Sequence, residues 1–518
     1  MVHGSGLTIS GMIIGEFTVS KLPDSAAPGN LRSRAISGGL FSMASHAIRL
    51  FIQLGTMVLL SRLLSPGEYG LVAMVLPFVA LIVLLQEAGV PMVTIMQQDI
   101  TPEQASDLFW LNVALSAVLG TLLAVCAPLV AGFYDDERLL LIVYAFAAMM
   151  IPAAISVQHR SLLQRSMNFR LLAGIDIVNQ FTAAALTVVA AWYGMGYWAL
   201  ILQTACLYLL QIPLLWMAYP WRPGRPRGFS QVRHLVRAGG EFAGFNILNF
   251  FSRYLDNVLI GKISGDVALG LYGRAYNLML TPINQINAPL GQVATPLLSR
   301  LVDDPQRYRS AYRQTVEKLL LITMPGIVVL MAAAEPVTVM MLGPTWRDVA
   351  PILSALALAA VVQPLNNSTS WLFISQGRSR DMLRWGLISS PLMVASFVVG
   401  LPWGPVGVAL SYAAVNLLVI TPVLWFRVGS PLFSKFDAGV TAFPFAIGCL
   451  LSGVPLFLAQ GFMATLHPVE AVALALAWAY MAQLAVLLAL PAYRHVVVGI
   501  VRLAVEVLRP LTRQKKQA

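Results

Sequence analysis

The feature that most constrains this fold is a series of apolar stretches, each long enough to cross a bilayer as a helix. A span takes about 20 apolar residues. Of the 518 residues, 58% are hydrophobic and 11% are charged, whereas a soluble domain has about a quarter of its residues charged. Hydropathy therefore predicts an all-α polytopic membrane protein. It has about 14 transmembrane helices, at 38–62, 69–96, 107–133, 138–158, 171–194, 196–219, 238–261, 268–298, 319–342, 349–374, 384–402, 405–426, 438–461 and 470–492.

The distribution of basic residues predicts the orientation, because the cytoplasmic loops of membrane proteins carry an excess of Lys and Arg. With the N-terminus inside, 27 of the 34 basic residues lie on the cytoplasmic side. Four face outside, namely Arg62, Arg138, Lys262 and Arg347. Three fall within predicted spans, namely Arg49, Arg253 and Arg274. Both termini are thus predicted to be cytoplasmic, and the net charge of +11 indicates topology and contact with anionic lipids rather than nucleic-acid binding.

The chain repeats at an offset of 200 residues. SRLLSPGEYGL begins at Ser61 and GKISGDVALGL at Gly261, and each copy is followed by a similar series of spans. This predicts two six-helix lobes in parallel repeat plus two C-terminal helices, with the substrate site of a transporter between the lobes. The predicted division is a cytoplasmic tail without the features of a signal peptide (1–36), an N-lobe (37–220), a basic linker (221–237), a C-lobe (238–428), the extra helices (438–492) and a basic amphipathic cytoplasmic tail (493–518).

Polar side chains inside the predicted spans are the candidates for function, because a formal charge near the bilayer centre costs roughly 3 kcal/mol. His46, Arg49 and Gln53 lie three and four residues apart, so they share one helix face. The stretch NFFSRYLDNVLIG places Arg253 and Asp256 three residues apart. This second group has two interpretations, an ion pair that fixes the helix or one wall of a cationic, water-filled cavity.

The chemistry of the side chains favours the cavity. A guanidinium fork suits phosphate, and amides suit sugar hydroxyls because they both donate and accept hydrogen bonds. The arginine candidates are Arg49, Arg253 and Arg274, and the amide candidates are Gln53, Asn249, Asn257, Asn277, Asn284, Asn366 and Asn367. Candidates for a coupling ion or an internal ion pair are His46, Asp176, Asp256 and Glu241. A purely structural partner is the alternative for each acid, and the amides can instead join helices.

Signatures of catalysis are missing from the sequence. It contains no G-x-x-x-x-G-K-[ST] loop and no H-E-x-x-H motif. Cys126, Cys206 and Cys449 lie far apart in apolar segments, without the spacing of a metal site. An enzyme is therefore not expected, and no cofactor is predicted beyond Na⁺ or H⁺ as a coupling ion.

The stretch YLDNVLIGKISGDVALGLYGRAYNLMLTP, together with DLFWLNVALS and LGPTWRDVAPIL, resembles the polysaccharide transporter family. The similarity is to Wzx-type oligosaccharide flippases, in the colanic-acid and exopolysaccharide exporter branch of the multidrug/oligosaccharidyl-lipid/polysaccharide exporter superfamily. It implies two lobes around a central cavity and export of an undecaprenyl-diphosphate-linked oligosaccharide across the bacterial inner membrane by alternating access. Such flippases use cavity arginines for the diphosphate, and only Arg49, Arg253 and Arg274 fit that role here.

The resemblance also implies the pathway and partners. The product would serve exopolysaccharide, capsule or lipopolysaccharide O-antigen biosynthesis, and the partners would be membrane lipids, a glycan polymerase and export machinery. The principal alternative is a multidrug/toxin-type cation antiporter on the same scaffold, whose cavity should be rich in carboxylates. A glycan polymerase or ligase would need a long outer loop, and a scaffold without transport would not need polar residues inside its spans.

Overall fold

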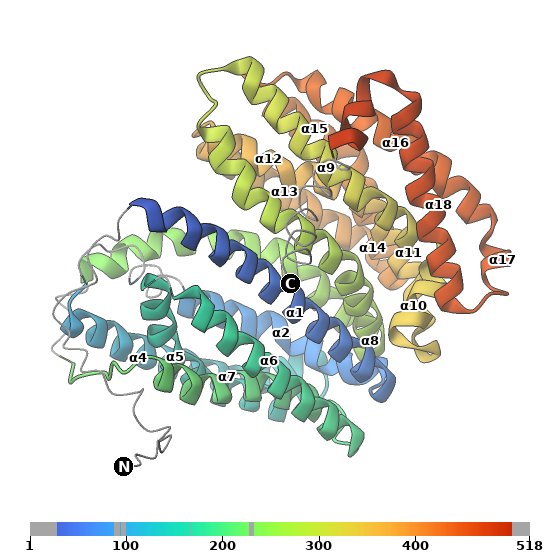
Figure 1. The fold of residues 1–518 in the computed structure, drawn as a ribbon. Coiled ribbons are helices and arrows are strands. Elements are labelled where there is room, and N and C mark those ends of the chain that lie inside the picture. Colours follow the sequence, from blue (N-terminus) through green and yellow to red (C-terminus); the bar gives the residue numbers. More distant parts are fainter. Residues whose placement is uncertain (1–27, 88–93, 95–99, 167, 227–232, 500–518) are drawn as a thin grey trace, which may run out of the picture.

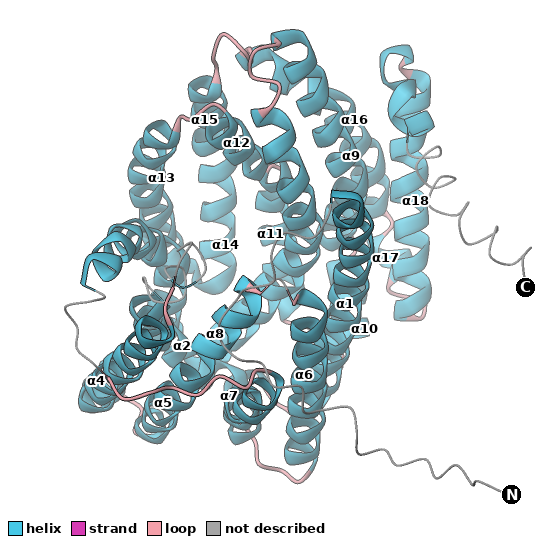
Figure 2. Cartoon of the chain, turned by 60° about the vertical axis from the view of Figure 1, so that its left-hand side comes forward, coloured by secondary structure: helices cyan, strands magenta, loops and turns pink. Residues whose placement is uncertain are grey.

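The computed structural model describes residues 28–87, 94, 100–166, 168–226 and 233–499, although not the side chains of 28–44, 87, 233–249, 251–253, 435, 436 and 438. These residues form helices and no strand (Figure 2), which confirms the all-α class. The principal helices are α1 (Pro28–Leu63), α2 (Pro66–Glu87), α4 (Pro102–Tyr134), α5 (Arg138–Arg165), α6 (Phe169–Trp192), α7 (Trp198–Ala218), α8 (Arg233–Ser299), α9 (Pro305–Ala332), α10 (Ala334–Leu342), α11 (Val349–Ala360), α12 (Gln363–Ser375), α13 (Ser379–Gly400), α14 (Gly404–Val415), α15 (Thr421–Val428), α16 (Lys435–Leu458), α17 (Gln460–Met463) and α18 (Pro468–Ala489).

Within the described residues, ten helical stretches are long and apolar enough to cross a membrane, which makes this a multi-pass membrane protein. Several bounds differ from the predicted spans. The predicted 138–158 continues to Arg165, and the predicted 319–342 begins at Pro305 and breaks at Ala333. The predicted 349–374 is divided between α11 and α12 just before Pro364, because proline lacks the N–H that would continue the helix.

The long α8 is folded back on itself at Gly265, whose φ of 84° is a conformation that glycine adopts without a steric penalty. The hydroxyl of Tyr272 donates to the Asp256 carboxylate at 3.0 Å. In a straight helix these residues would be about 24 Å apart, because each residue adds 1.5 Å. The two halves of α8 are therefore antiparallel, as the separate spans 238–261 and 268–298 predict.

Figure 1 shows α4 to α7 lying together on one side of the molecule and α9 to α18 on the other, with α8 between them. α1 packs against α6 and also reaches α10, whereas α2 packs most extensively against α8. The two halves of the chain therefore meet mainly through α2 and α8.

The crossing of α2 and α8 depends on two glycines of the repeated motif. A Cβ at Gly70 would overlap the backbone carbonyl of Asp266, and a Cβ at Gly270 would overlap the backbone carbonyl of Pro66. Positions 70 and 66 correspond to positions 270 and 266 under the 200-residue offset. The glycine of each motif therefore contacts the equivalent backbone carbonyl of the other motif. Direct contact between the backbones follows from the lack of a side chain at both positions.

Candidate functional site

Arg49, Arg160 and Asp176 converge from three helices, α1, α5 and α6. The Arg160 guanidinium donates to both oxygens of Asp176, at 2.7 and 2.9 Å. Arg49 donates to Oδ2 of the same carboxylate at 3.2 Å and lies 3.1 Å from the Nδ1 atom of His46. The structure thus brings together three predicted site residues, His46, Arg49 and Asp176. It adds Arg160, which the sequence assigned to a loop because the predicted span stopped at 158.

Arg274, in the second half of α8, lies on an aromatic ring. Its guanidinium carbon is 3.5 Å from the centroid of the Tyr69 ring, a close cation–π contact. The side chain is partly buried. No carboxylate lies within ion-pair distance of it among the described side chains, so its charge is not neutralised by any of them.

Asp256 is 3% exposed. Its carboxylate accepts hydrogen bonds from the Tyr272 hydroxyl and, at 2.8 Å, from the backbone N–H of Asn257. The neighbouring Arg253 lies outside the described side chains, so the predicted pair with Asp256 remains a prediction. The same holds for the predicted roles of Glu241 and Asn249.

The predicted amides divide into two groups. Asn366 connects helices, since it donates to Thr421 at 2.8 Å and accepts from the Trp425 indole at 3.2 Å. Its contacts match the alternative in which amides join helices, and Asn367 is partly buried beside it. Asn257 is also partly buried, whereas the exposed amides, which remain available to a ligand, are Gln53, Asn277 and Asn284.

An apolar cavity of about 350 Å³ lies between the two halves of the chain. Its wall consists of residues from α1, the second half of α8, α9, α10 and α18. Leu54, Ile283 and Ile327 are typical of the lining, and Asn277 is its single amide. The lining also includes Thr281, Thr323 and Tyr480. Because most of the wall is apolar, the cavity suits a hydrocarbon chain with a few polar side chains beside it.

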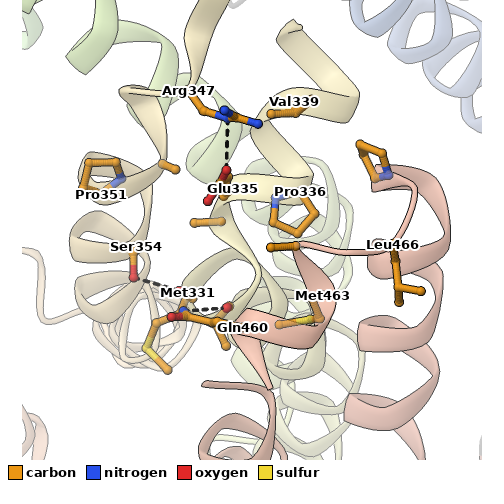
Figure 3. Close-up of a pocket in the computed structure, with 15 residues that line it drawn as sticks. Met331, Glu335, Pro336, Val339, Arg347, Pro351, Ser354, Gln460, Met463 and Leu466 are labelled. Carbon is orange, nitrogen blue, oxygen red and sulfur yellow. Dashed lines mark hydrogen bonds and ion pairs between the residues drawn. The ribbon is translucent and has the colours of Figure 1, made fainter. Parts of the chain in front are cut away.

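A second cavity of similar size lies where α9, α10 and α11 meet α17 (Figure 3). The Glu335 and Arg347 side chains, 3.0 Å apart, pair with each other across it. Gln460 donates to the Ala332 carbonyl, and Ser354 to the Met331 carbonyl. Because these polar groups already have protein partners, this cavity offers less to a polar ligand than Arg274, which has no carboxylate partner among the described side chains.

The helix ends predicted to face outside are joined across the two halves of the chain. Lys262 pairs with Asp135 at 2.7 Å, and Arg138 pairs with Asp266 at 3.2 Å. Arg138 also bonds Asp136, which lowers the pKa of that carboxyl and keeps it charged. The buried Trp346 indole donates to the Ser61 carbonyl at 2.6 Å. These contacts join the two halves of the chain at this end.

Comparisons with known proteins bear on the family and the fold of this chain. TuaB, a teichuronic acid biosynthesis protein of Bacillus subtilis (strain 168), is 25% identical over 69% of this chain and 74% of its own length. ExoT, a succinoglycan biosynthesis transport protein of Rhizobium meliloti (strain 1021), is 25% identical over 79% of this chain and 83% of its own. The solved structure of the lipid II flippase MurJ in an inward closed conformation covers 85% of this chain and 98% of its own, with a TM-score of 0.63.

At 13% identity, the likeness to MurJ shows a shared fold. The family evidence comes from the sequence, in which a model described as "Polysaccharide biosynthesis protein" matches residues 59–351. This match spans more than half of the chain and includes both copies of the repeated motif. The protein therefore belongs to the polysaccharide biosynthesis protein family, the group of polysaccharide transporters that its sequence resembles.

Proposed function

We propose that this protein is a flippase of the bacterial inner membrane. It moves undecaprenyl-diphosphate-linked oligosaccharide repeat units from the inner to the outer leaflet, for the synthesis of an exopolysaccharide, capsule or O-antigen. The names of TuaB and ExoT support the pathway, and the MurJ-like fold supports the type of movement. We assign no catalytic step to it.

The observation that carries this proposal is Arg274, a partly buried cation with no acid among its described contacts. Such a cation is costly to keep in a membrane unless an anion visits it. Arg274 also disfavours the function of a cation antiporter, because its unpaired positive charge would repel a cationic substrate. Together with Arg49 and Arg253, Arg274 would bind the diphosphate. The glycan would contact Gln53, Asn249, Asn257, Asn277, Asn284 and Asn367, whereas Asn366 holds helices together.

The finer architecture belongs to the same proposal. We infer fourteen spans in two six-helix lobes plus two helices, with both termini in the cytoplasm. The fold-back of α8 and the packing of α13 on α14 support the count, because each divides one long helical stretch into two crossings. Na⁺ or H⁺ would couple transport. The buried Asp256 carboxylate is the preferred coupling group, ahead of His46, Asp176 and Glu241.

A gene deletion tests the function directly. Cells without the protein should accumulate the lipid-linked repeat unit in the inner leaflet, and a plasmid copy should restore export. If the repeat unit does not accumulate while polymer synthesis stops, the protein acts at another step. The accumulated lipid can be measured by mass spectrometry of membrane extracts.

The apolar cavity predicts a separate effect on the lipid chain. Gly326 lines the cavity, and nothing lies within 4 Å of a Cβ placed there. Gly326→Phe should fill the space and reduce export in the complementation assay by roughly tenfold, about 1.4 kcal/mol in apparent affinity. Gly386→Phe on α13 is the matched control, since its Cβ position is equally open but lies outside the cavity. Equal export by the two variants would exclude this cavity as the lipid site.

The joined outer ends predict that transport requires their separation. In a variant without its native cysteines, Asp135→Cys with Lys262→Cys should be cross-linked by a short bismaleimide, and cross-linking should stop export. Lys262→Cys should have little effect on stability, because exposed ion pairs contribute about 0.2–1 kcal/mol. Asp135→Cys should cost about 1–2 kcal/mol more, because Asp135 has a left-handed backbone conformation with a φ of 57°. Asp304→Cys with Arg307→Cys lies within one segment and serves as the control. Undiminished export after complete cross-linking of Asp135 and Lys262 would contradict alternating access at this end.

A further inference from the structure

The cluster of Arg49, Arg160 and Asp176 carries more positive charge than its carboxylate can neutralise. Two guanidinium groups share one carboxylate, which leaves a net charge of +1. The side chains of Arg49 and Arg160 are 29% and 33% exposed, and that of Asp176 is 16% exposed. The cluster is therefore accessible. Each guanidinium also has more N–H donors than the Asp176 carboxylate can accept hydrogen bonds from.

Arg49 has unused hydrogen-bonding capacity. Its Nε atom is buried and has no hydrogen-bond partner among the described residues. Only one terminal nitrogen of the Arg49 guanidinium donates to Asp176, whereas both terminal nitrogens of Arg160 donate to this carboxylate. A larger anion with more oxygens would satisfy Arg49 better than the carboxylate does.

The polar face of α1 is separate from its exposed apolar face. His46, Arg49 and Gln53 lie on one side of the helix, whereas Ile48, Phe51 and Leu59 are exposed on another. Because lipid chains would cover the apolar face, the arginine is directed away from them. Gln180 of α6 donates to the Arg49 carbonyl at 3.3 Å and holds this face of α1 toward the polar cluster.

We infer that Arg160 binds the substrate diphosphate together with Arg49, and that Asp176 occupies the same donors when no substrate is present. This inference rests on the proposed function. A diphosphate diester carries two negative charges, which match the two guanidinium groups, and the planar forks suit its oxygens. Binding would release Arg49 from Asp176 and so loosen the contact between α1 and α6. Asp176 is thus a positioning residue that sets the affinity of the site.

The test measures pyrophosphate and farnesyl diphosphate binding to the purified full-length protein in detergent. Asp176→Asn removes the internal competitor and should tighten binding by roughly tenfold, since the paired carboxylate no longer has to be displaced. Arg160→Gln should weaken binding by at least about tenfold. Arg160→Lys keeps the charge but loses the fork, so it should weaken binding several-fold without lowering the melting temperature.

The matched control is Asp381→Asn. Asp381 pairs with Arg378 at 2.9 Å and with Arg384 at 3.7 Å on another part of the chain, so this substitution also removes one acid that two arginines share. It should leave pyrophosphate affinity unchanged. If Asp176→Asn and Asp381→Asn change affinity equally, only net charge matters and the inference is wrong. If Asp176→Asn lowers both the melting temperature and the affinity, the cluster is a structural ion pair and the inference is again overturned.

Failure of the inference differs from failure of the proposed function. Accumulation of the lipid-linked unit in the deletion strain, with unchanged pyrophosphate affinity in Arg160→Gln, would overturn the inference alone. No accumulation, with tighter pyrophosphate binding by Asp176→Asn, would leave the anion site in place and overturn the assigned substrate.

Discussion

Arg274→Met is expected to abolish export while leaving the melting temperature unchanged or raised. The substitution keeps an unbranched side chain of similar length and removes a cation that has no acid among its described contacts. Desolvating an ion costs several kcal/mol, and the contact with the Tyr69 ring recovers about 0.5–2 kcal/mol. Removal of the charge should therefore not weaken the fold. Export should stop because the diphosphate loses a cation on its path.

The measurement combines complementation of the deletion strain with thermal melting of the purified variant. Arg274→Lys should retain part of the activity, since the charge stays but the fork is lost. Arg347→Met is the control, because Arg347 pairs with Glu335 outside the proposed path. Full export by Arg274→Met would remove Arg274 from the mechanism. A large loss of melting temperature would instead give the residue a structural role.

Gly70→Ala and Gly270→Ala should each reduce the amount of folded protein severely. In both variants the new Cβ would overlap a backbone carbonyl, which cannot rotate away as a side chain can. Overpacking costs about 1–3 kcal/mol in ordinary cores and occasionally more. We expect the upper part of this range, because α2 and α8 would have to separate along their whole crossing.

Gly273→Ala is the matched control for this second prediction. It lies one helical turn from Gly270, yet nothing is within 4 Å of its Cβ position. Alanine favours the helix over glycine by about 1 kcal/mol, so this variant should be as stable as the parent or slightly more so. Size-exclusion chromatography and thermal melting in detergent would measure the difference. Equal behaviour of Gly270→Ala and Gly273→Ala would mean that the helices do not require direct backbone contact.

Helix positions could be predicted well because each span must satisfy its own backbone hydrogen bonds in lipid. The predicted 171–194 and 470–492 lie within two or three residues of α6 and α18 at both ends. The bounds were poorer where a helix extends beyond its apolar part, as at Arg165 and Pro305. A hydropathy-based span ends at the first charged residues, whereas the helix continues as long as its backbone hydrogen bonds are made. Arg160 was missed as a site residue for this reason.

The site was harder to predict than the fold. Helical periodicity correctly placed His46 and Arg49 on one face, and their contact is present. Periodicity cannot say which helix packs against that face. Asp176 is 127 residues from Arg49, and the bond between them exists only because α1 packs on α6. Likewise, Asp256 was considered with Arg253, its neighbour in sequence, but its described side-chain partner is Tyr272 on the other half of the α8 hairpin.

The amino-acid sequence determined the membrane class, the approximate helix positions, the family and the repeated glycine motif, because these depend on composition and local spacing. The tertiary structure alone decided the partners of the charged groups. It assigned Asp176 to two arginines, placed Arg274 on Tyr69 and brought the two motifs into backbone contact. The physical reason is that the energy of a buried charge is set by atoms within a few ångströms, and these come from helices that are distant in sequence.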